Sequence, residues 1–491
     1  MGSRWKTAAL CALSVVLLTA CGQKERLQSE TPVEHTFENV SVHDPAVVKG
    51  EDGAYYIFGS HLAVAKTGDL MNWEYVNDGM KAHSSVIPDV YDVMADAFAW
   101  SRSDTFWAPD VVRLQDGKYH MYYCNCQGSE PQSCTGMAVS DSAAGPYENR
   151  GLFLYSGTGS DGMNGFDSVY QPTRDPNAVD PCVFFDAQGR LWMIYGSYSG
   201  GIFVKEMDPQ TGLALEPGYG KKLLGGNHLR IEAPYIIYNE DTGYYYMFLS
   251  FGGLDSDGGY NVRVCRSKTP DGPYLDSMGQ DMIDCKGPSG SAFSDATAAL
   301  YGTKLMGCYK FLWSEGEEGE ERKGYLSPGH NSCLYQEETG KYFIIYHTRF
   351  ENRGEEHQVR VHQMFFNEDG WPVITPYRYT GETMGTYTKD DVAGTYKYIN
   401  HGRDISPKIR ESILVELKKD GKIAGELEGT WELTDDHKIT LTVDGDTYQG
   451  VVLKQWDEDG KKYVMTFTAL NAATGISVWG SGLSAVEADA S

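Results

Sequence analysis

Hydrophobic and polar positions alternate along the chain in short runs, and one such pattern returns five times. Each copy has a polar start, a short apolar strand, a turn rich in Asp, Glu or Gly, and a second, aromatic strand. The pattern predicts a β-hairpin, and a further strand follows each copy. The five copies are HDPAVVKGEDGAYYIFGS from His43, WAPDVVRLQDGKYHMYYC from Trp107, VDPCVFFDAQGRLWMIYGS from Val179, IEAPYIIYNEDTGYYYMFLS from Ile231 and GHNSCLYQEETGKYFIIYHT from Gly329.

Repeats of this kind predict a β-propeller, because self-similar all-strand units of roughly 40 to 70 residues pack face to face around an axis. Five copies predict five blades, over residues 33–384. After Met384 the pattern changes to short alternating strands with turns such as KDGK and DDHK. Residues 385–491 are therefore expected to form a small antiparallel barrel or sandwich, and the fold class is all-β.

The first residues have the pattern of an export signal. Basic residues precede an apolar run from Ala8 to Ala20, which is too short to span a bilayer. LTAC, ending at Cys21, resembles a bacterial lipoprotein cleavage box. That resemblance implies a signal over residues 1–20, lipidation of Cys21 and a polar tether over 21–32, with a plain secretory signal as the alternative. We expect an exported protein, lipid-anchored at the cell envelope.

Composition and charge narrow the possible ligands. Hydrophobic residues make up 41% and charged residues 22%, which is typical of a globular protein. The net charge of -26 repels nucleic acid, makes unsubstituted polygalacturonate an improbable ligand and favours a neutral or cationic one. The 33 tyrosines suit a surface that binds sugars, although tyrosine also fills β-structure. A monomer is expected, and the acidic run from Ser314 to Lys323 is expected to be a solvated loop.

Cysteine spacing leaves two interpretations open. Cys124, Cys126 and Cys134 lie close together in the sequence and could form a disulfide or hold a metal. The chain has no C-x-x-C pair, so the pattern of a zinc site is weak. Buried free thiols are the alternative.

Acidic residues stand at the start of three of the five repeats, namely Asp44, Asp180 and Glu232. The first strand of each propeller blade lines the central channel, so these carboxylates are expected to converge at one end of it. Hydrolysis of an acetal needs a proton donor on one side of the bond and a base or nucleophile on the other. The alternative, that these residues only cap turns, explains a single acid better than an ordered set.

The motifs HDPAVV, NAVDP and RIEAPYIIY, in that order, resemble glycoside hydrolase family 43. GGNHLRIEAPY and YHTRF…HQVRVHQMFFNEDGWPV resemble its arabinan endo-1,5-α-L-arabinanases, in the longer type with an extra C-terminal β-domain. The resemblance runs from about Val33 to the C-terminus. It implies inverting endo-hydrolysis of α-1,5-arabinofuranosyl links in arabinan. The alternatives are an exo-acting α-L-arabinofuranosidase or β-xylosidase of the same fold, and a non-catalytic surface glycan-binding lipoprotein.

The resemblance also implies roles for single residues. Asp44 is the general base, Glu232 the general acid, and Asp180 orients Glu232 and raises its pKa. His330 is implied to hold a calcium ion, partly through water. The implied substrate-binding residues are Asn177, Ser197, Tyr198, Ser199 and Trp107, of which Trp107 either stacks on a sugar or packs between blades.

Two further aspartates compete for these assignments. Asp175 lies in an RDP motif, which the related invertases and levansucrases use. We prefer Asp180, because an apolar strand follows it directly, as in the other repeats. Asp110, in WAPD, is expected to be structural.

Overall fold

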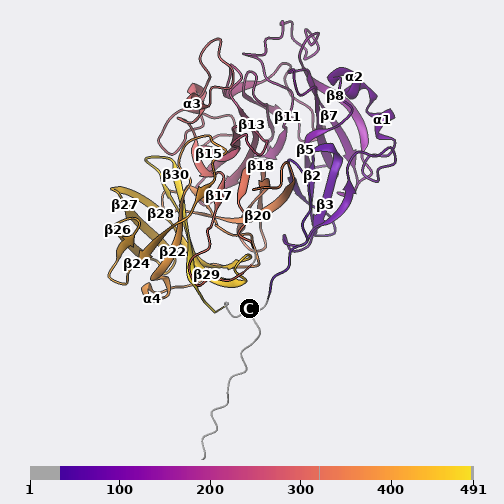
Figure 1. Ribbon diagram of the computed structural model, residues 1–491. Helices are drawn as coiled ribbons and strands as arrows, with labels where there is room; N and C mark the ends of the chain where they lie inside the picture. The colour runs from indigo at the N-terminus through magenta and orange to yellow at the C-terminus, as the bar shows by residue number, and fades with distance from the viewer. Residues whose placement is uncertain (1–33, 320, 488–491) are drawn as a thin grey trace, which may run out of the picture. The chain divides into compact units, whose positions relative to one another are not determined.

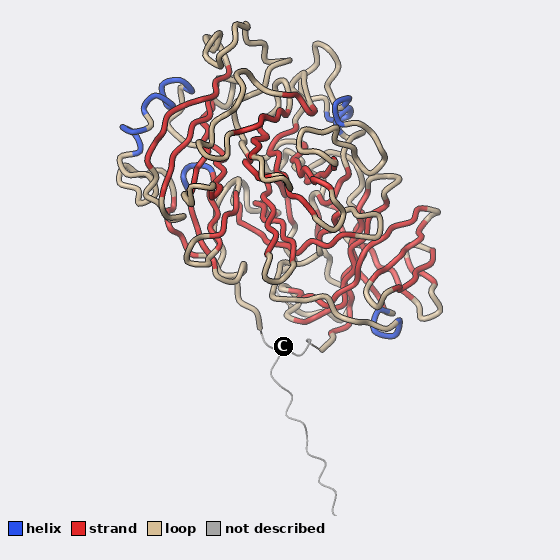
Figure 2. The backbone as a smooth tube through the Cα atoms, turned by 180° about the vertical axis from the view of Figure 1, so that it is seen from behind, coloured by secondary structure: helices blue, strands red, loops and turns tan. Residues whose placement is uncertain are grey.

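The computed structural model describes residues 34–319 and 321–487. The predicted signal, the tether and Cys21 lie outside these residues. Strands make up nearly all the regular structure, as Figures 1 and 2 show, and the all-β prediction is confirmed. In the described part of the chain, no helix has the length and apolar character needed to cross a membrane.

Three separate four-stranded antiparallel sheets come from the first half of the chain. In each, neighbouring strands follow one another in the sequence, which is the arrangement of a propeller blade. The three sheets contain β1 (Ala46–Lys49), β2 (Tyr55–Gly59), β3 (Ala63–Thr67) and β4 (Glu74–Asp78); β5 (Trp107–Arg113), β6 (Tyr119–Cys126), β7 (Ser133–Ser140) and β8 (Glu148–Ser156); and β9 (Cys182–Phe185), β10 (Leu191–Tyr195), β11 (Ile202–Met207) and β12 (Lys221–Leu224).

Two further sets have the same strand order, but each continues into other strands. The first set joins the C-terminal strands, and the second is extended by β17 (Tyr309–Lys310) and β23 (Arg410–Glu411). The arrangement is propeller-like, but its sheets are not the five separate ones that the sequence predicted. The two sets are β13 (Ile231–Asn239), β14 (Tyr244–Phe251), β15 (Asn261–Ser267) and β16 (Thr303–Met306); and β18 (Tyr325–Gln336), β19 (Lys341–Phe350), β20 (His357–Phe366) and β21 (Pro372–Ile374).

The helices of the described residues are short and lie in connections between strands (Figure 2). They are α1 (Val90–Val93), α2 (Ala95–Ser101), α3 (Asp295–Ala298), α4 (Lys389–Val392) and the 3₁₀ turns η1 (Ser60–Leu62) and η2 (Met282–Asp284).

Eight C-terminal strands close into a barrel, because the last strand pairs with both the first and the seventh. Its interior holds alternate residues of these strands, among them Trp431, Leu441 and Phe467. Closure leaves no free sheet edge within the barrel. The strands are β22 (Gly394–Asn400), β24 (Ile413–Leu417), β25 (Lys422–Gly425), β26 (Gly429–Thr434), β27 (Lys438–Val443), β28 (Asp446–Asp457), β29 (Lys462–Asn471) and β30 (Ile476–Ala485).

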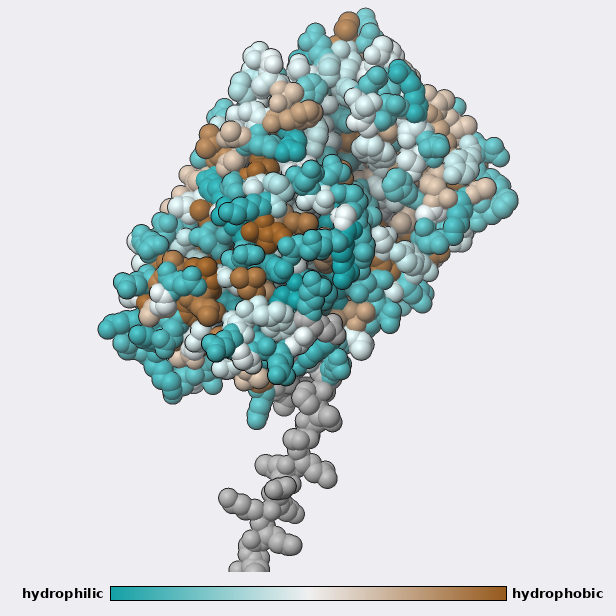
Figure 3. Space-filling model, in the orientation of Figure 1, coloured by the Kyte–Doolittle hydropathy of each residue, from teal (hydrophilic) through white to brown (hydrophobic). Residues whose placement is uncertain are grey.

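The barrel and the propeller-like part share one sheet and one core. β16 pairs in parallel with β30 through Lys304 and Ile476. One hydrophobic cluster contains Tyr246 and Phe248 of β14 together with Trp479 of β30. Figure 1 shows the yellow barrel strands directly against the orange strands of the preceding set. The outer surface on this side is mostly hydrophilic (Figure 3), as the charge of the chain suggests.

The acidic run from Ser314 to Lys323 is only partly the solvated loop that we expected. The side chain of Glu317 is buried and forms ion pairs with Lys397 at 2.6 Å, Lys462 at 3.0 Å and Arg322 at 3.3 Å. A buried carboxylate needs such partners, because removal from water is costly. Composition could not predict this role. Lys397 and Lys462 are far from Glu317 in the sequence, and Arg322 belongs to the same charged run, where nothing distinguishes it from a solvent-exposed residue.

All eight cysteines of the described residues are free and buried. Cys124, Cys126 and Cys134 form no disulfide, and they belong to the interior of β6 and β7. The alternative of buried free thiols therefore holds.

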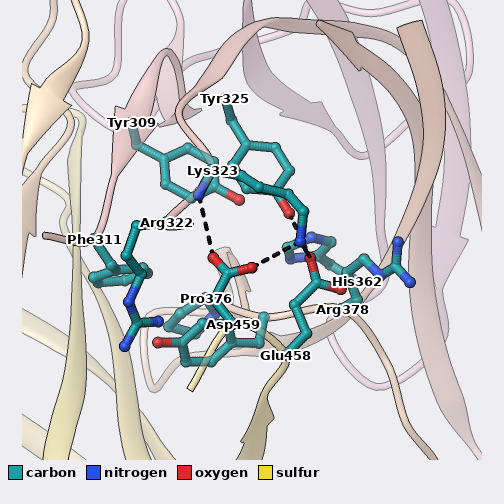
Figure 4. A pocket seen from close by; sticks show the side chains of 11 residues that line it. Tyr309, Phe311, Arg322, Lys323, Tyr325, His362, Pro376, Arg378, Glu458 and Asp459 are labelled. Carbon is teal, nitrogen blue, oxygen red and sulfur yellow. Dashed lines mark hydrogen bonds and ion pairs between the residues drawn. The ribbon is translucent and has the colours of Figure 1, made fainter. Parts of the chain in front are cut away.

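Glu458 lies near Lys323 and Arg378 where the barrel meets the propeller-like part (Figure 4), and it makes the stability of this junction depend on pH. Burial would raise its pKa, but Arg378, Arg360 and Lys323 outweigh burial and lower the pKa to about 2. Because this pKa is lower in the folded protein than in the unfolded chain, ionised Glu458 stabilises the fold above pH 4.5, and the stabilisation is lost as the pH falls toward 2.

We expect the melting temperature to fall between pH 4.5 and pH 2. The variant Glu458→Gln should be less stable than the parent at pH 7, and its melting temperature should fall less over this pH range. Thermal unfolding at several pH values measures both, and equal slopes in parent and variant would contradict the assignment.

Candidate active site

The starts of the five repeats meet at one small cavity of about 20 Å³, enough for a single water molecule. Each repeat contributes the equivalent two positions. These pairs are Asp44–Pro45, Ala108–Pro109, Asp180–Pro181, Ala233–Pro234 and His330–Asn331. The structure therefore brings together at one channel the residues that the repeat pattern aligned.

The equivalent position has a left-handed backbone in four of the five repeats. The φ angles are 59° at Asp44, 54° at Asp180, 55° at Ala233 and 43° at His330. Residues other than glycine rarely adopt this conformation, and those that do are concentrated at functional sites. Four repetitions at one channel show that the strained turn is built into the repeat.

Glu232 lies one residue before the equivalent position, which Ala233 occupies. The prediction placed Glu232 in register with Asp44 and Asp180, and that register is wrong by one residue. Glu232 is paired with Ser250 of β14, and the register of the pairing between β13 and β14 shifts only after Glu232, before Tyr235. Its carboxylate therefore starts from a different backbone position than the two aspartates.

Asp44 is held as an ionised carboxylate by three neighbours. Ser60 donates a hydrogen bond from its hydroxyl to Oδ2 at 2.5 Å, and His43 Nδ1 lies 2.7 Å from the same oxygen. His330 Nδ1 lies 2.9 Å from Oδ1. Burial would raise the pKa of Asp44, but His330 and His43 outweigh it and hold the pKa well below its ordinary value. An ionised, buried carboxylate can accept a proton from a water molecule.

His347 supports Asp44 from the backbone side. Its Nδ1 accepts a hydrogen bond from the Asp44 N–H at 3.2 Å, so this nitrogen carries no proton. Burial lowers the pKa of His347 well below its ordinary value, which keeps the ring neutral. The ring stacks on His43 with centroids 3.9 Å apart. Ligand atoms of His43, Asp44 and His347 lie within 4.8 Å of one another. Sequence reasoning assigned no role to either histidine, although His43 stands in the HDP motif and His347 in the YHTRF motif.

The charges of both Glu232 and Asp44 act on the carboxyl group of Asp180. Its Oδ2 accepts a hydrogen bond from the N–H of Ala233 at 3.1 Å, which ties it to the residue after Glu232. Burial raises the pKa of Asp180 to about 7; His330 opposes this rise, and Glu232 and Asp44 add to it. A carboxyl group so placed can fix the backbone of Glu232 and respond to its charge.

Glu232 accepts hydrogen bonds at both carboxyl oxygens. Ser197 donates to Oε2 at 2.7 Å, and the buried phenol of Tyr260 donates to Oε1. Both hydroxyls can also turn and accept, so they can hold Glu232 in place whether or not it carries a proton. Ser197 was predicted to bind substrate, and here it orients a carboxylate. Tyr260 was not predicted, because it lies in the connection before β15 with no motif around it.

His330 contacts Asp44, and its charge also interacts with the carboxyl groups of Asp180 and Glu232. Burial would lower its pKa, but Asp44 and Asp180 raise it to about 9, and Glu232 acts in the same direction. The same cavity is lined by Asn331, whose buried Oδ1 has no hydrogen-bond partner. Calcium prefers six to eight oxygen ligands. One imidazole and one unpaired amide oxygen fit an ion that keeps most of its ligands as water, and the His330 ring would have to lose one proton to bind it.

The predicted substrate-binding residues lie in different environments. Asn177 is used inside the fold, where its Oδ1 accepts from Ser133 at 2.5 Å. Trp107 is half-buried and packs against a cluster that includes Cys124. Tyr198 and Ser199 form a left-handed turn, and the phenol of Tyr198 donates to the Gly252 carbonyl at 3.2 Å. Burial raises the pKa of Tyr198, and the charges of Glu232 and Asp180 add to this rise.

Phe293 is an aromatic side chain beside the site that the sequence did not single out. It is 56% exposed, and its ring meets that of Tyr198 with centroids 5.9 Å apart. Asp295, two residues on, accepts from Arg230 Nε at 2.9 Å, which fixes this loop against the strand of Glu232. An exposed ring held by an ion pair can serve as a stacking platform for a sugar face.

The two competing aspartates have structural partners. Asp175 accepts two hydrogen bonds from the Arg174 guanidinium at 2.8 Å and one from the Gln171 N–H at 2.8 Å. Asp110 accepts from the Val183 N–H at 2.6 Å and so links β5 to β9. Neither lines the small channel cavity.

Comparison with known proteins identifies relatives over most of the chain. The profile of glycosyl hydrolases family 43 matches residues 34–304, and a C-terminal lipocalin-like domain profile matches residues 376–480. The extracellular endo-α-(1→5)-L-arabinanase 2 of Bacillus subtilis is 53% identical over 91% of this chain and 93% of its own.

Two crystal structures have the same fold over nearly their whole length. A family 43 glycoside hydrolase from Bacillus licheniformis is 51% identical, with a TM-score of 0.87 over 91% of this chain and 99% of that one. The endo-1,5-α-L-arabinanase of Thermotoga petrophila is 46% identical, with a TM-score of 0.86 over 91% of this chain and 100% of that one.

Proposed function

The chain belongs to glycoside hydrolase family 43, and on that premise we propose that it hydrolyses internal α-1,5-linked arabinofuranosyl units of arabinan with inversion. The observation that carries the proposal is the meeting of Asp44, Asp180 and Glu232 around His330 at the starts of the repeats. The endo activity of relatives that match almost the whole chain supports the choice of substrate.

In this proposal Asp44 is the general base. Its low pKa keeps it ionised, so it can take a proton from the water that attacks the anomeric carbon. His43, Ser60 and the neutral ring of His347 hold its carboxylate in place. Inversion requires this base and the acid to lie on opposite faces of the sugar, with room for water between them.

Glu232 is the general acid, which protonates the leaving oxygen as the bond breaks. Ser197 and Tyr260 fix its carboxyl group, and Asp180 fixes the adjacent backbone. We propose that Asp180, through its hydrogen bond from the Ala233 N–H, positions Glu232 for this proton transfer. Tyr198 and Phe293 together would bind a neighbouring sugar ring of the chain.

We also propose that five blades form the catalytic domain, over residues 33–384, with the barrel as a second domain over 385–491. The strand order of the fourth and fifth sets repeats that of the three separate sheets, and all five contribute equivalent residues to one cavity. Export with a lipid on Cys21, and a monomer, complete the proposal. The extracellular relatives support export.

The test of the activity is a product profile on linear, debranched arabinan beside xylan. Endo action should release a ladder of arabino-oligosaccharides from arabinan early in the reaction, with no products from xylan. Release of arabinose alone would indicate the exo-acting alternative. Binding of arabinan without any products would indicate the non-catalytic glycan-binding alternative.

A calcium ion at His330, held mainly through water, is part of the proposal. His330 and the unpaired oxygen of Asn331 would face it, and its charge would stabilise the carboxylates around it. We expect a strong chelator to lower the melting temperature by several degrees and to reduce hydrolysis, and added calcium to restore both. His330→Gln should make the melting temperature insensitive to chelator. A parent protein whose melting temperature and activity ignore the chelator would rule out the ion.

A further inference from the structure

Arg349 is a buried arginine of β19 that lies beside the proposed base. It is 4% exposed, and its Nη2 lies 3.4 Å from Nε2 of His43, whose Nδ1 lies 2.7 Å from Oδ2 of Asp44. A guanidinium only donates hydrogen bonds, so Nε2 of His43 accepts, and in the neutral ring Nδ1 carries the proton. His43 therefore donates to Asp44 from Nδ1, in the tautomer that Arg349 selects.

His347 does not have the same relation to Arg349. Its Nε2 also lies 3.4 Å from Arg349, from Nη1. However, its Nδ1 accepts from the Asp44 N–H, so its Nε2 carries the proton and cannot accept from Arg349. The His347 ring instead stacks on the His43 ring, with an interplanar angle of 28°, and restrains its rotation.

Glu355 supplies the negative charge that Arg349 needs. Its Oε2 lies 2.5 Å from Arg349 Nε, and within residues 34–319 and 321–487 Arg349 forms no other ion pair. Loss of this anion would leave a buried guanidinium uncompensated. The same carboxylate accepts from the Ser256 hydroxyl at 2.6 Å and from the Ser256 N–H at 3.2 Å. Glu355 therefore joins Arg349 to a second segment of the chain, although its side chain is 55% exposed.

Ser256 lies in the turn that leads from β14 to Tyr260. The N–H of Tyr260 donates to the Gly253 carbonyl at 3.1 Å, so the turn closes directly before the tyrosine. The Tyr260 ring lies against Gly329, where it leaves no room for a Cβ atom. Its phenol donates to Glu232. The position of this turn therefore sets the position of a hydrogen-bond donor to the proposed acid.

We propose that Arg349 and Glu355 form one positioning unit that serves both catalytic carboxyl groups, an inference that rests on the proposed function. Arg349 sets the tautomer in which His43 donates to the base, and Glu355 connects Arg349 to the turn whose tyrosine donates to the acid. Both are positioning residues, since each acts through another side chain. Catalytic groups must be held within about 0.5 Å of their productive geometry, and supporting side chains of this kind provide that precision.

Glu355→Gln keeps the shape of the side chain and removes its charge, so it should disturb both sides of the site. Turnover of linear arabinan should fall about 10–100-fold. An aryl glycoside of an arabino-oligosaccharide should recover only part of this loss, because a good leaving group relieves the acid but not the base. Ser256→Ala loosens the turn alone, so its loss on arabinan, about ten-fold or less, should disappear on the aryl glycoside.

Glu356→Gln is the matched control for Glu355→Gln. Glu356 is the next acid of the same loop, and its carboxylate accepts only from Arg353 and Gln358, both at 3.4 Å, within the described part of the chain. Its rates on both substrates should equal those of the parent. Melting temperatures check that all the variants are folded.

The tautomer of His43 is measured by ¹⁵N NMR of the full chain with labelled histidine, because protonated and unprotonated ring nitrogens resonate far apart. The His43 signals are those that His43→Gln lacks. In the parent they should show a protonated Nδ1 and an unprotonated Nε2. They should shift in Glu355→Gln and stay unchanged in Glu356→Gln.

Two results would overturn the positioning unit. One is a parent in which Nε2 of His43 carries a proton, and the other is a folded Glu355→Gln with parental rates on both substrates. A parent that hydrolyses no arabinan would refute the proposed function instead. The NMR spectra need no substrate, so they would still decide whether Arg349 and Glu355 set the tautomer of His43.

Discussion

Replacement of Glu232 with glutamine should lower turnover of linear arabinan by about 10²–10⁴-fold, because the leaving oxygen loses its proton donor. Glutamine keeps the shape of the side chain and can still contact Ser197 and Tyr260, so the fold and substrate binding should persist. The loss should nearly disappear with an aryl glycoside of an arabino-oligosaccharide, since a good leaving group needs no proton. Steady-state rates on both substrates measure this contrast.

Asp110→Asn is the matched control for Glu232→Gln. Asp110 is also a buried acid in the first strand of a repeat, but its carboxylate accepts from the Val183 backbone, and the amide oxygen can do the same. Turnover should stay within a few-fold of the parent. Near-parental hydrolysis of arabinan by Glu232→Gln, or equal losses in both variants, would exclude Glu232 as the acid.

Replacement of Asp44 with asparagine should reduce turnover by a similar factor, about 10²–10⁴-fold, through loss of the base that activates water. Here the aryl glycoside should not restore the rate, because attack by water is required whatever the leaving group. The two variants therefore differ in their response to the leaving group, and this difference assigns acid and base separately. The measurement is the rate of Asp44→Asn on arabinan and on the aryl glycoside, and its melting temperature checks that the variant is folded.

Asp175→Asn completes the comparison for Asp44→Asn. Asp175 is buried in a loop beside Arg174, and asparagine can still accept from the Gln171 N–H, so its replacement should leave turnover within a few-fold of the parent. A retaining mechanism through Asp175 would instead make this variant inactive and leave Asp44→Asn active. That pattern would reverse the assignment.

The sequence predicted the convergence of the acids well because a repeated fold turns equal positions in the chain into neighbours in space. Asp44, Asp180 and His330 each lie at the equivalent position of a repeat, so their meeting followed from the period alone. The offset of Glu232 by one residue could have been read from the sequence, because a proline follows the equivalent position in HDP, VDP and EAP, and in EAP that position is Ala233. The shift in strand pairing after Glu232 also occurs in β5 and β18, so it belongs to the repeat and does not explain the offset.

The supporting residues could not be predicted in this way. Tyr260 contacts Glu232 from the connection before β15 in the same repeat, where no local pattern marks it. His347 contacts Asp44 from another repeat, and the YHTRF motif around it gave no indication of this role. Glu317 lies in a run whose composition indicates exposure, and only the folded barrel supplies Lys397 and Lys462 as partners. Such roles depend on contacts between distant segments, which a single sequence does not encode in any local pattern.

The parallel pairing of β16 with β30 has a consequence for attempts to separate the two domains. A shortened chain that stops before the barrel would leave β16 with unpaired amide and carbonyl groups, and would uncover Tyr309, whose ring packs against Trp479 with centroids 4.9 Å apart. Such a fragment would be prone to aggregate. Engineering that trims this protein to its catalytic half would have to supply a substitute for the missing neighbour.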